Sequence, residues 1–201
     1  MPSELAPADE IAERLLDAAV EAATIHGITR LSMSDVATRA GVSRPTLYKR
    51  FSSKDELVAA AVLREANAMI DAVLAAAEPF EDPADALEAA VLVSLRLTRD
   101  HPLLDRIVRT EPETLVPLLV ADPSPVLAFG RAAAERVIAT KAPELSEVGT
   151  RRLADALLRL LISYALTPPD DPPEIVAASI AAVLTSGLDE RRPLTRTVED
   201  R

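Results

Sequence analysis

Hydrophobic residues along this chain recur at intervals of three and four positions, which is the spacing of amphipathic α-helices. The first such stretch covers residues 9–26, and Gly27 is expected to end it. Prolines, glycines and polar breaks separate further expected helices at residues 54–78, 85–99, 103–109, 113–120, 126–141, 146–165 and 174–188. With two short helices inside residues 32–51, this pattern predicts an all-α fold of about nine helices. Prolines leave open whether residues 113–141 form one kinked helix or two.

Residues 32–51 predict two short helices joined by a tight turn. Ser43 stands where the second helix needs an N-cap, and Gly41 falls where the chain must turn through a left-handed conformation. Ala37, Gly41 and Leu47 have the spacing of the small, turn and anchor residues of a helix-turn-helix, in which the second helix crosses close above the first. The residues that point outward from this second helix are Arg44, Pro45, Thr46, Tyr48, Lys49 and Arg50.

From Ile11 to about Val62, the chain resembles the DNA-binding domain of the TetR family of one-component repressors. The similarity is greatest in the segment AGVSRPTLYKRFSSKDEL, where the Gly-Val-Ser turn, the Leu-Tyr pair and the Phe-x-x-Lys-x-x-Leu run match in order and spacing. The resemblance implies a three-helix helix-turn-helix domain, followed by a larger helical domain for effector binding and dimerisation. We place the first at residues 9–53, after a flexible arm at 1–8, and the second at 54–188, before a polar tail at 189–201.

The resemblance also implies the DNA contacts. Residues that match Thr46, Tyr48 and Lys49 contact the operator in this family, and residues that match Ser32 and Lys54 contact phosphates. The Tyr48 hydroxyl is expected on a phosphate, with packing of its ring inside the domain as the alternative. The complete set of candidate DNA-binding residues is Ser32, Met33, Ser43, Arg44, Pro45, Thr46, Tyr48, Lys49 and Lys54.

The side-chain chemistry of the second short helix suits the major groove. Arg44 and Lys49 are the candidates for guanine, whose O6 and N7 accept hydrogen bonds there. Pro45 can offer only an apolar contact, for example to a thymine methyl. Lys54, in the first turn of the next helix, opposes the helix dipole and is therefore well placed for a phosphate.

The charge distribution agrees with a DNA partner. The whole chain carries a net charge of −10, but residues 28–54 hold six basic side chains against one acidic side chain, Asp35. Such a concentrated basic segment can neutralise phosphates, while the acidic remainder discourages non-specific binding. The alternative is that these are ordinary solvated helix faces.

Other classes of function find little support. The chain has no cysteine and only two histidines, with no phosphate loop and no metal-ligand spacing, so we predict no enzyme activity, metal or cofactor. Its longest uncharged run, residues 175–188, is too short to span a membrane. The N-terminus is acidic and lacks the apolar segment of a signal peptide. We therefore expect a cytoplasmic protein that has no contact with membranes.

The last two helices are apolar around most of their circumference and need more cover than one subunit offers. A four-helix interface between two identical subunits would supply it, as the resemblance also implies; a fully intramolecular core is the alternative. The candidate interface residues are Leu153, Leu157, Leu161, Tyr164, Ile180, Val183 and Leu184.

The resemblance implies an effector cavity among the middle helices. Candidate lining residues are Val91, Leu95, Arg99, His101, Leu104, Phe129 and Ile162, although each could belong to an ordinary core. Because aromatic residues make up only 2% of the chain, an aliphatic or acyl-type effector is favoured over a large planar cation. The basic residues between 96 and 109 could bind a carboxylate or could simply be solvated.

These observations predict a homodimeric TetR-like transcriptional regulator. We expect a repressor that releases a palindromic double-stranded operator when it binds a small, largely apolar effector. The alternative is a DNA-binding organiser, or a regulator controlled by another protein, with a filled helical core and no effector.

Overall fold

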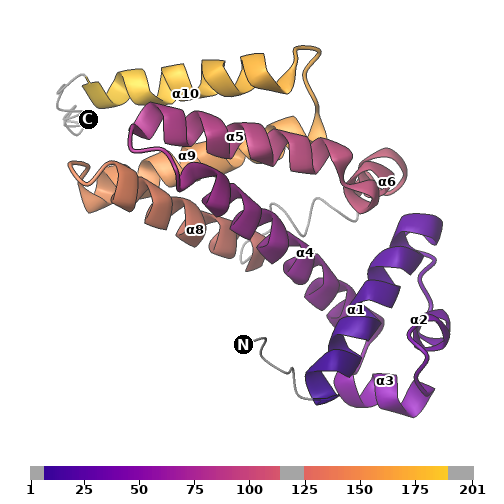
Figure 1. Ribbon diagram of the computed structural model, residues 1–201. Helices are drawn as coiled ribbons and strands as arrows, with labels where there is room; N and C mark the ends of the chain where they lie inside the picture. The colour runs from indigo at the N-terminus through magenta and orange to yellow at the C-terminus, as the bar shows by residue number, and fades with distance from the viewer. Residues whose placement is uncertain (1–6, 114–124, 190–201) are drawn as a thin grey trace, which may run out of the picture.

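A computed structural model describes residues 7–113 and 125–189, and these residues form nine α-helices and no strand (Figure 1). The helices are α1 (Pro7–His26), α2 (Met33–Arg39), α3 (Arg44–Arg50), α4 (Lys54–Ala77), α5 (Pro83–Asp100), α6 (Pro102–Thr110), α8 (Pro125–Lys141), α9 (Glu147–Leu166) and α10 (Pro173–Asp189). The prediction of an all-α fold is confirmed.

The observed helix bounds lie close to the predicted ones. Each of the seven long helices within the described ranges starts and ends within two residues of its expected position. Pro7 and Ala8, which we assigned to the flexible arm, instead begin α1, since proline needs no N–H partner in the first turn of a helix. The helix expected at 113–120 and the polar tail fall almost entirely outside the described residues.

The N-terminal domain, α1–α3, has the predicted turn geometry. Leu47 is fully buried and Ala37 is 2% exposed, as the close crossing of α2 and α3 requires. Gly41 has a φ of +64°, a conformation that L side chains rarely adopt. Arg14 of α1 secures this turn, because its guanidinium donates hydrogen bonds to the carbonyls of Ala40 and Gly41.

The core of the N-terminal domain does not end with α3. Leu57 and Ala61 of α4 and Leu103 and Ile107 of α6 belong to the same buried cluster as Leu47. Because α4 has 24 residues, it is about 36 Å long and extends from this core far into the rest of the molecule (Figure 1). Two helices of the C-terminal domain therefore complete the core of the N-terminal one.

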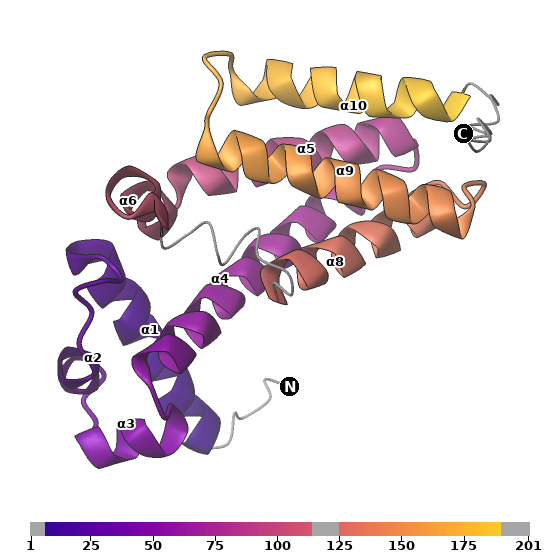
Figure 2. The ribbon, with the colours of Figure 1, turned by 180° about the vertical axis from the view of Figure 1, so that it is seen from behind.

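The C-terminal domain, α4–α10, is built around α5, which packs against α4, α9 and α10. Its main core cluster contains Val91, Leu95, Leu157, Val176 and Ile180. The helix α8 packs along α9 and also contacts α4, while Figure 2 shows α9 across the near side of this domain and α10 along its upper edge. Within the described ranges, no helix combines the length and hydropathy needed to cross a membrane.

Candidate nucleic-acid interface and ligand cavity

The outer surface of α3 is basic and exposed to solvent. Arg44, Lys49 and Arg50 are exposed, and among the described residues none of them has a hydrogen-bond or ion-pair partner. Tyr48 is 48% exposed. These side chains project from a helix whose inner face is fixed by Leu47, and the helix can therefore present them together to one groove of a duplex.

The two serine N-caps position the helices of the motif. The hydroxyl of Ser43 accepts a hydrogen bond from the Thr46 amide at 3.2 Å and lies 2.7 Å from the Thr46 hydroxyl. Ser32 accepts from the Asp35 amide at 3.4 Å. Both serines are exposed and remain candidates for a phosphate contact. Met33, which is also a candidate for a DNA contact, begins α2 and is half-buried, packed against the core.

Arg39 does not belong to the free basic surface. Its guanidinium donates to Asp35 at 3.0 Å and to Glu21 of α1 at 2.8 Å. The hydrogen bond to Asp35 is the main cause of a raised pKa of Arg39. Arg39 therefore holds α2 against α1, and the cations left for phosphates are those at positions 30, 44, 49, 50 and 54.

Lys54, which we expect to contact a DNA phosphate, also forms a hydrogen bond within the protein. Its ammonium donates a hydrogen bond to the carbonyl oxygen of Thr29 at 2.8 Å. An ammonium has three donors, so this bond leaves Lys54 able to contact a phosphate. The same Thr29 donates from both its amide and its hydroxyl to Oε2 of Glu111, each at 2.9 Å. We call Thr29, Lys54 and Glu111 the Thr29 clamp.

The Thr29 clamp joins the two domains directly. Glu111 caps the C-terminal end of α6, is 9% exposed, and reaches the α1–α2 loop of the N-terminal domain. Gly27 makes room for it, because a Cβ at this position would lie 1.7 Å from Oε1 of Glu111 and because φ there is +86°. The sequence gives no signal for this contact, since Thr29 and Glu111 are 82 positions apart.

A second polar connection joins α1, α4 and the junction of α5 and α6. Arg64 donates to Asp17 at 2.7 Å and to Glu13 at 3.2 Å, both on α1. It also donates to Oε1 of Glu65 at 2.7 Å, and the other oxygen of Glu65 lies 3.2 Å from Nε2 of His101. This chain of contacts runs from the N-terminal domain to the wall of a cavity.

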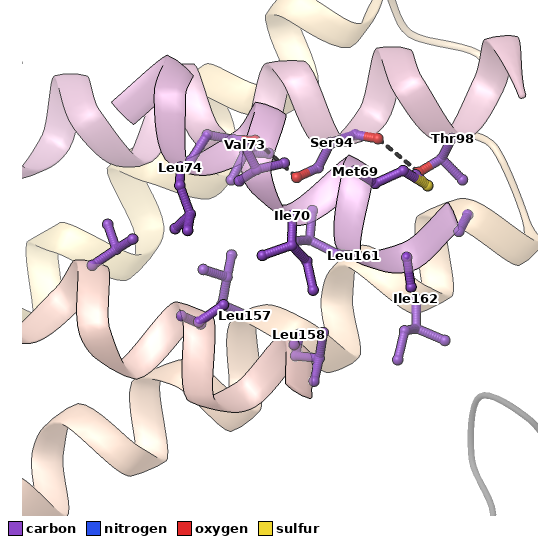
Figure 3. A pocket seen from close by; sticks show the side chains of 18 of the residues that line it. Met69, Ile70, Val73, Leu74, Ser94, Thr98, Leu157, Leu158, Leu161 and Ile162 are labelled. Carbon is purple, nitrogen blue, oxygen red and sulfur yellow. Dashed lines mark hydrogen bonds between the residues drawn. The ribbon is translucent and has the colours of Figure 1, made fainter. Parts of the chain in front are cut away.

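That cavity, of about 270 Å³, lies between α4, α5, α6, α8 and α9 (Figure 3). Its lining is almost wholly aliphatic and includes Met69, Ile70, Val73, Leu74, Leu157, Leu158, Leu161 and Ile162. An engineered cavity of about 150 Å³ with such walls already binds benzene, so this one can admit a small ligand.

The expected lining residues divide into three groups. Val91, His101, Leu104 and Ile162 line the cavity. Leu95 and Arg99 line a neighbouring cavity of about 430 Å³, which shares Thr98, Leu104, Val108 and Ala165 with the first. Phe129 was wrongly placed: it is 39% exposed, because the small residues Gly130, Ala133 and Ala134 form the side of α8 that faces the cavity.

The residues chosen for a subunit interface fall into two groups. Leu153, Leu157 and Leu161 line the cavity, and Tyr164, Ile180 and Leu184 pack in the core around α5. Val183 is different, with 71% of its surface exposed. The faces of α9 and α10 that carry most of the large apolar residues thus pack against the core and the cavity of the same subunit. Their outer faces carry exposed Val148, Leu160, Ile175 and Val183 instead, interspersed with alanine.

Comparison with known families identifies the fold. Residues 15–61 match the family of bacterial regulatory proteins called tetR, and residues 82–186 match the C-terminal domain of the bacterial tetracyclin repressor. The second match alone covers more than half of the chain. The chain therefore belongs to the TetR family of helix-turn-helix transcriptional regulators, whose members bind DNA and act as dimers.

Individual relatives extend this result. The regulator AlkX of Mycobacterium tuberculosis is 25% identical over 86% of this chain and 82% of its own length. The activator FasR of Mycolicibacterium smegmatis is 40% identical, but over 42% of this chain and 39% of its own length. An uncharacterized HTH-type regulator of M. tuberculosis is 34% identical over 46% of each chain, so the chain spans less than half the length of several curated relatives it matches.

Solved structures share the whole fold. The repressor AlkX from a Dietzia strain, implicated in biodegradation of n-alkanes, superposes with a TM-score of 0.73 at 22% identity, over 92% of this chain and 97% of that one. The fatty acid degradation regulator FadR from Bacillus halodurans superposes with a TM-score of 0.62 at 18% identity, over 94% of this chain and 100% of that one.

Replacing Lys54 with alanine tests its expected phosphate contact. We expect binding to weaken about equally for the operator and for random duplexes. The slope of log K against log salt should become shallower by about 0.9, the value for one phosphate. Fluorescence anisotropy over a range of salt concentrations measures both quantities.

Lys141→Ala is the matched control, since Lys141 also donates to backbone carbonyls but lies at the far end of α8. It should leave the salt slope unchanged. A Lys54→Ala protein that binds more weakly but keeps the parental slope would show that Lys54 acts only through Thr29.

Proposed function

We propose that this protein is a homodimeric repressor that releases a palindromic operator when a small, largely apolar molecule enters the 270 Å³ cavity. The observation that supports this most is the double role of α4 and α6. Both helices line the cavity, and both contribute buried residues to the core of the DNA-binding domain. A cavity in this position argues against the alternative of a filled, effector-independent core.

The outer faces of α9 and α10 supply the surface for a second copy. The exposed apolar residues on these helices are Val148 and Leu160 of α9 and Ile175 and Val183 of α10. Alanines at 156, 178 and 182 lie between them and permit close helix approach. Two copies related by a twofold axis bury these faces in a four-helix interface. The same axis relates the α3 helices of the two copies, which are the recognition helices, and this accounts for a palindromic operator.

The route from cavity to DNA passes through the Thr29 clamp and Arg64. A ligand that moves α6 pulls Glu111 against Thr29, and a ligand that tilts α4 pulls Arg64 against Asp17 and Glu13. Either movement changes the position of the recognition helix relative to its twin. Operator and effector then each lower the affinity for the other by the same factor, as linkage requires.

The names of the relatives support an aliphatic effector. One structural neighbour is implicated in the biodegradation of n-alkanes, and another is a regulator of fatty acid degradation. The direction of regulation varies, since FasR is an activator and DrrR1 of Streptomyces coeruleorubidus is a repressor. Repression requires only that the dimer occupies a promoter, so it needs the fewest additional contacts from this chain.

Replacing Val183 with arginine tests the interface. A charge on this apolar face should abolish the dimer, because it would be desolvated without a partner. Operator affinity should fall by about 100-fold or more, since two linked recognition helices bind far more tightly than one. Sedimentation equilibrium and anisotropy with an operator selected from random duplexes measure the two effects.

Phe80→Arg serves as control, since Phe80 is also exposed but lies in the loop between α4 and α5. This variant should remain dimeric and bind DNA normally. A Val183→Arg protein that stays dimeric and retains its operator affinity would contradict the proposed interface.

Replacing Glu111 tests the clamp through the Thr29 amide. In Glu111→Ala this amide loses its acceptor, so its hydrogen exchange should accelerate by at least about tenfold. Glu111→Gln retains a carbonyl oxygen and should preserve most of the protection. Hydrogen exchange followed by nuclear magnetic resonance gives the rates. Equal protection in all three proteins would mean that Glu111 does not hold Thr29.

A further inference from the structure

The cavity has a polar strip along one wall. Ser94 and Thr98 lie one turn apart on the same face of α5, His101 caps the C-terminal end of this helix, and all three line the cavity. Glu65 of α4 joins them through His101. Figure 3 shows Ser94 and Thr98 on the α5 wall of an otherwise aliphatic chamber. A ligand that fills the chamber must place some part of itself against this strip.

The hydroxyl protons of the strip are already used. Ser94 donates to the Ala90 carbonyl at 2.8 Å, and Thr98 donates to the Ser94 carbonyl at 2.7 Å, the bonds drawn in Figure 3. Each hydroxyl oxygen keeps its lone pairs, so both side chains face the cavity as acceptors.

The imidazole has no spare donor either. Nδ1 of His101 accepts from the Leu104 amide at 3.4 Å, which assigns the ring proton to Nε2. That nitrogen lies 3.2 Å from the Glu65 carboxylate and donates to it. The strip therefore presents acceptor atoms only: two hydroxyl oxygens and the remaining lone pairs of Glu65.

The charge on the α4 side of the strip, at Glu65, is negative. Arg64 is the cation beside Glu65, but it is shared with Asp17 and Glu13, so one guanidinium serves three carboxylates. Lys141 also lines the cavity, and it donates to the carbonyls of Glu78 and Phe80 in the α4–α5 loop. A carboxylate placed on the strip would meet the like charge of Glu65 and find no donor among the Ser94, Thr98 and His101 side chains, which is costly in an apolar chamber.

We propose that the effector is an aliphatic molecule with a hydrogen-bond donor at one end, a hydroxyl or an ammonium, and that the strip rejects the matching carboxylate. This inference rests on the proposed function and specifies its ligand. The donor lies against Thr98, Ser94 and Glu65, and the chain fills the aliphatic part of the cavity. Contact with Glu65 also places the ligand on the connection through Arg64 to α1.

Isothermal titration calorimetry of the full-length protein with chains of equal length tests the proposal. The probes are octan-1-ol, octylamine, sodium octanoate and 1-methoxyheptane, with hexyl and decyl analogues of each. The ether has as many heavy atoms as octan-1-ol but no donor. We expect the alcohol or the amine to bind at least about tenfold more tightly than the ether and the carboxylate, as one hydrogen bond to a charged group permits.

Two variants locate the effect. Thr98→Val keeps the shape of the side chain and removes the acceptor, so the preference for alcohol over ether should shrink several-fold. Glu65→Gln removes the charge, so discrimination against octanoate should shrink. Melting curves and circular dichroism establish whether both variants are folded. If Thr98→Val does not fold, Ser94→Ala provides a second test of the acceptor role.

The outcomes separate the two proposals. Octanoate binding as tightly as the alcohol, or an alcohol preference unchanged in both Thr98→Val and Ser94→Ala, would overturn the assignment of the head group and leave the effector cavity standing. Absence of binding for every probe at every length would overturn both.

Discussion

The N-terminal domain lacks a complete core of its own, and this constraint governs the rest of the structure. Leu57 and Ala61 of α4, with Leu103 and Ile107 of α6, close the cluster around Leu47 and Val36. Buried apolar contacts of this kind are the main source of stability in a domain this small. The recognition helix is consequently held by α4 and α6, the same two helices that form walls of the cavity. A movement of either helix therefore changes the packing of the recognition helix.

Polar contacts between the two domains add fixed connections to that shared core. Apolar packing transmits a push but tolerates small sliding, whereas the bonds from Thr29 to Glu111 and from Arg64 to Asp17 have fixed donors and acceptors. They connect the C-terminal end of α6 to the α1–α2 loop, and the middle of α4 to α1. Arg64 and Glu65 are consecutive in the chain. Glu65 lines the cavity and Arg64 binds Asp17 of α1, so only one peptide unit separates the cavity wall from the contact with α1.

Much of the fold could be predicted from local sequence, because caps, turns and helical periodicity are short-range effects. Ser43, Gly41 and Leu47 have the expected roles for this reason. The pairing of apolar faces could not be predicted in this way. Periodicity located the apolar stripes of α9 and α10 but not whether α5 or a second subunit covers them, so Leu157 and Ile180 were assigned to the wrong surface. The contact of Glu111 with Thr29 joins distant positions and leaves no local pattern. Phe129 lies in a helix of weak amphipathicity, and the cavity-facing residues closest to it in sequence are the small Gly130, Ala133 and Ala134.

The central claim is that filling the cavity moves the recognition helices, and the distance between them is the most direct test. The chain has no cysteine, so Ile25→Cys, an exposed position on α1, gives one spin-label site in each subunit. Double electron–electron resonance should show a new distance population when the ligand that most raises the melting temperature is added, together with loss of operator binding. A ligand that stabilises the protein yet leaves both the distance distribution and the operator affinity unchanged would contradict the account.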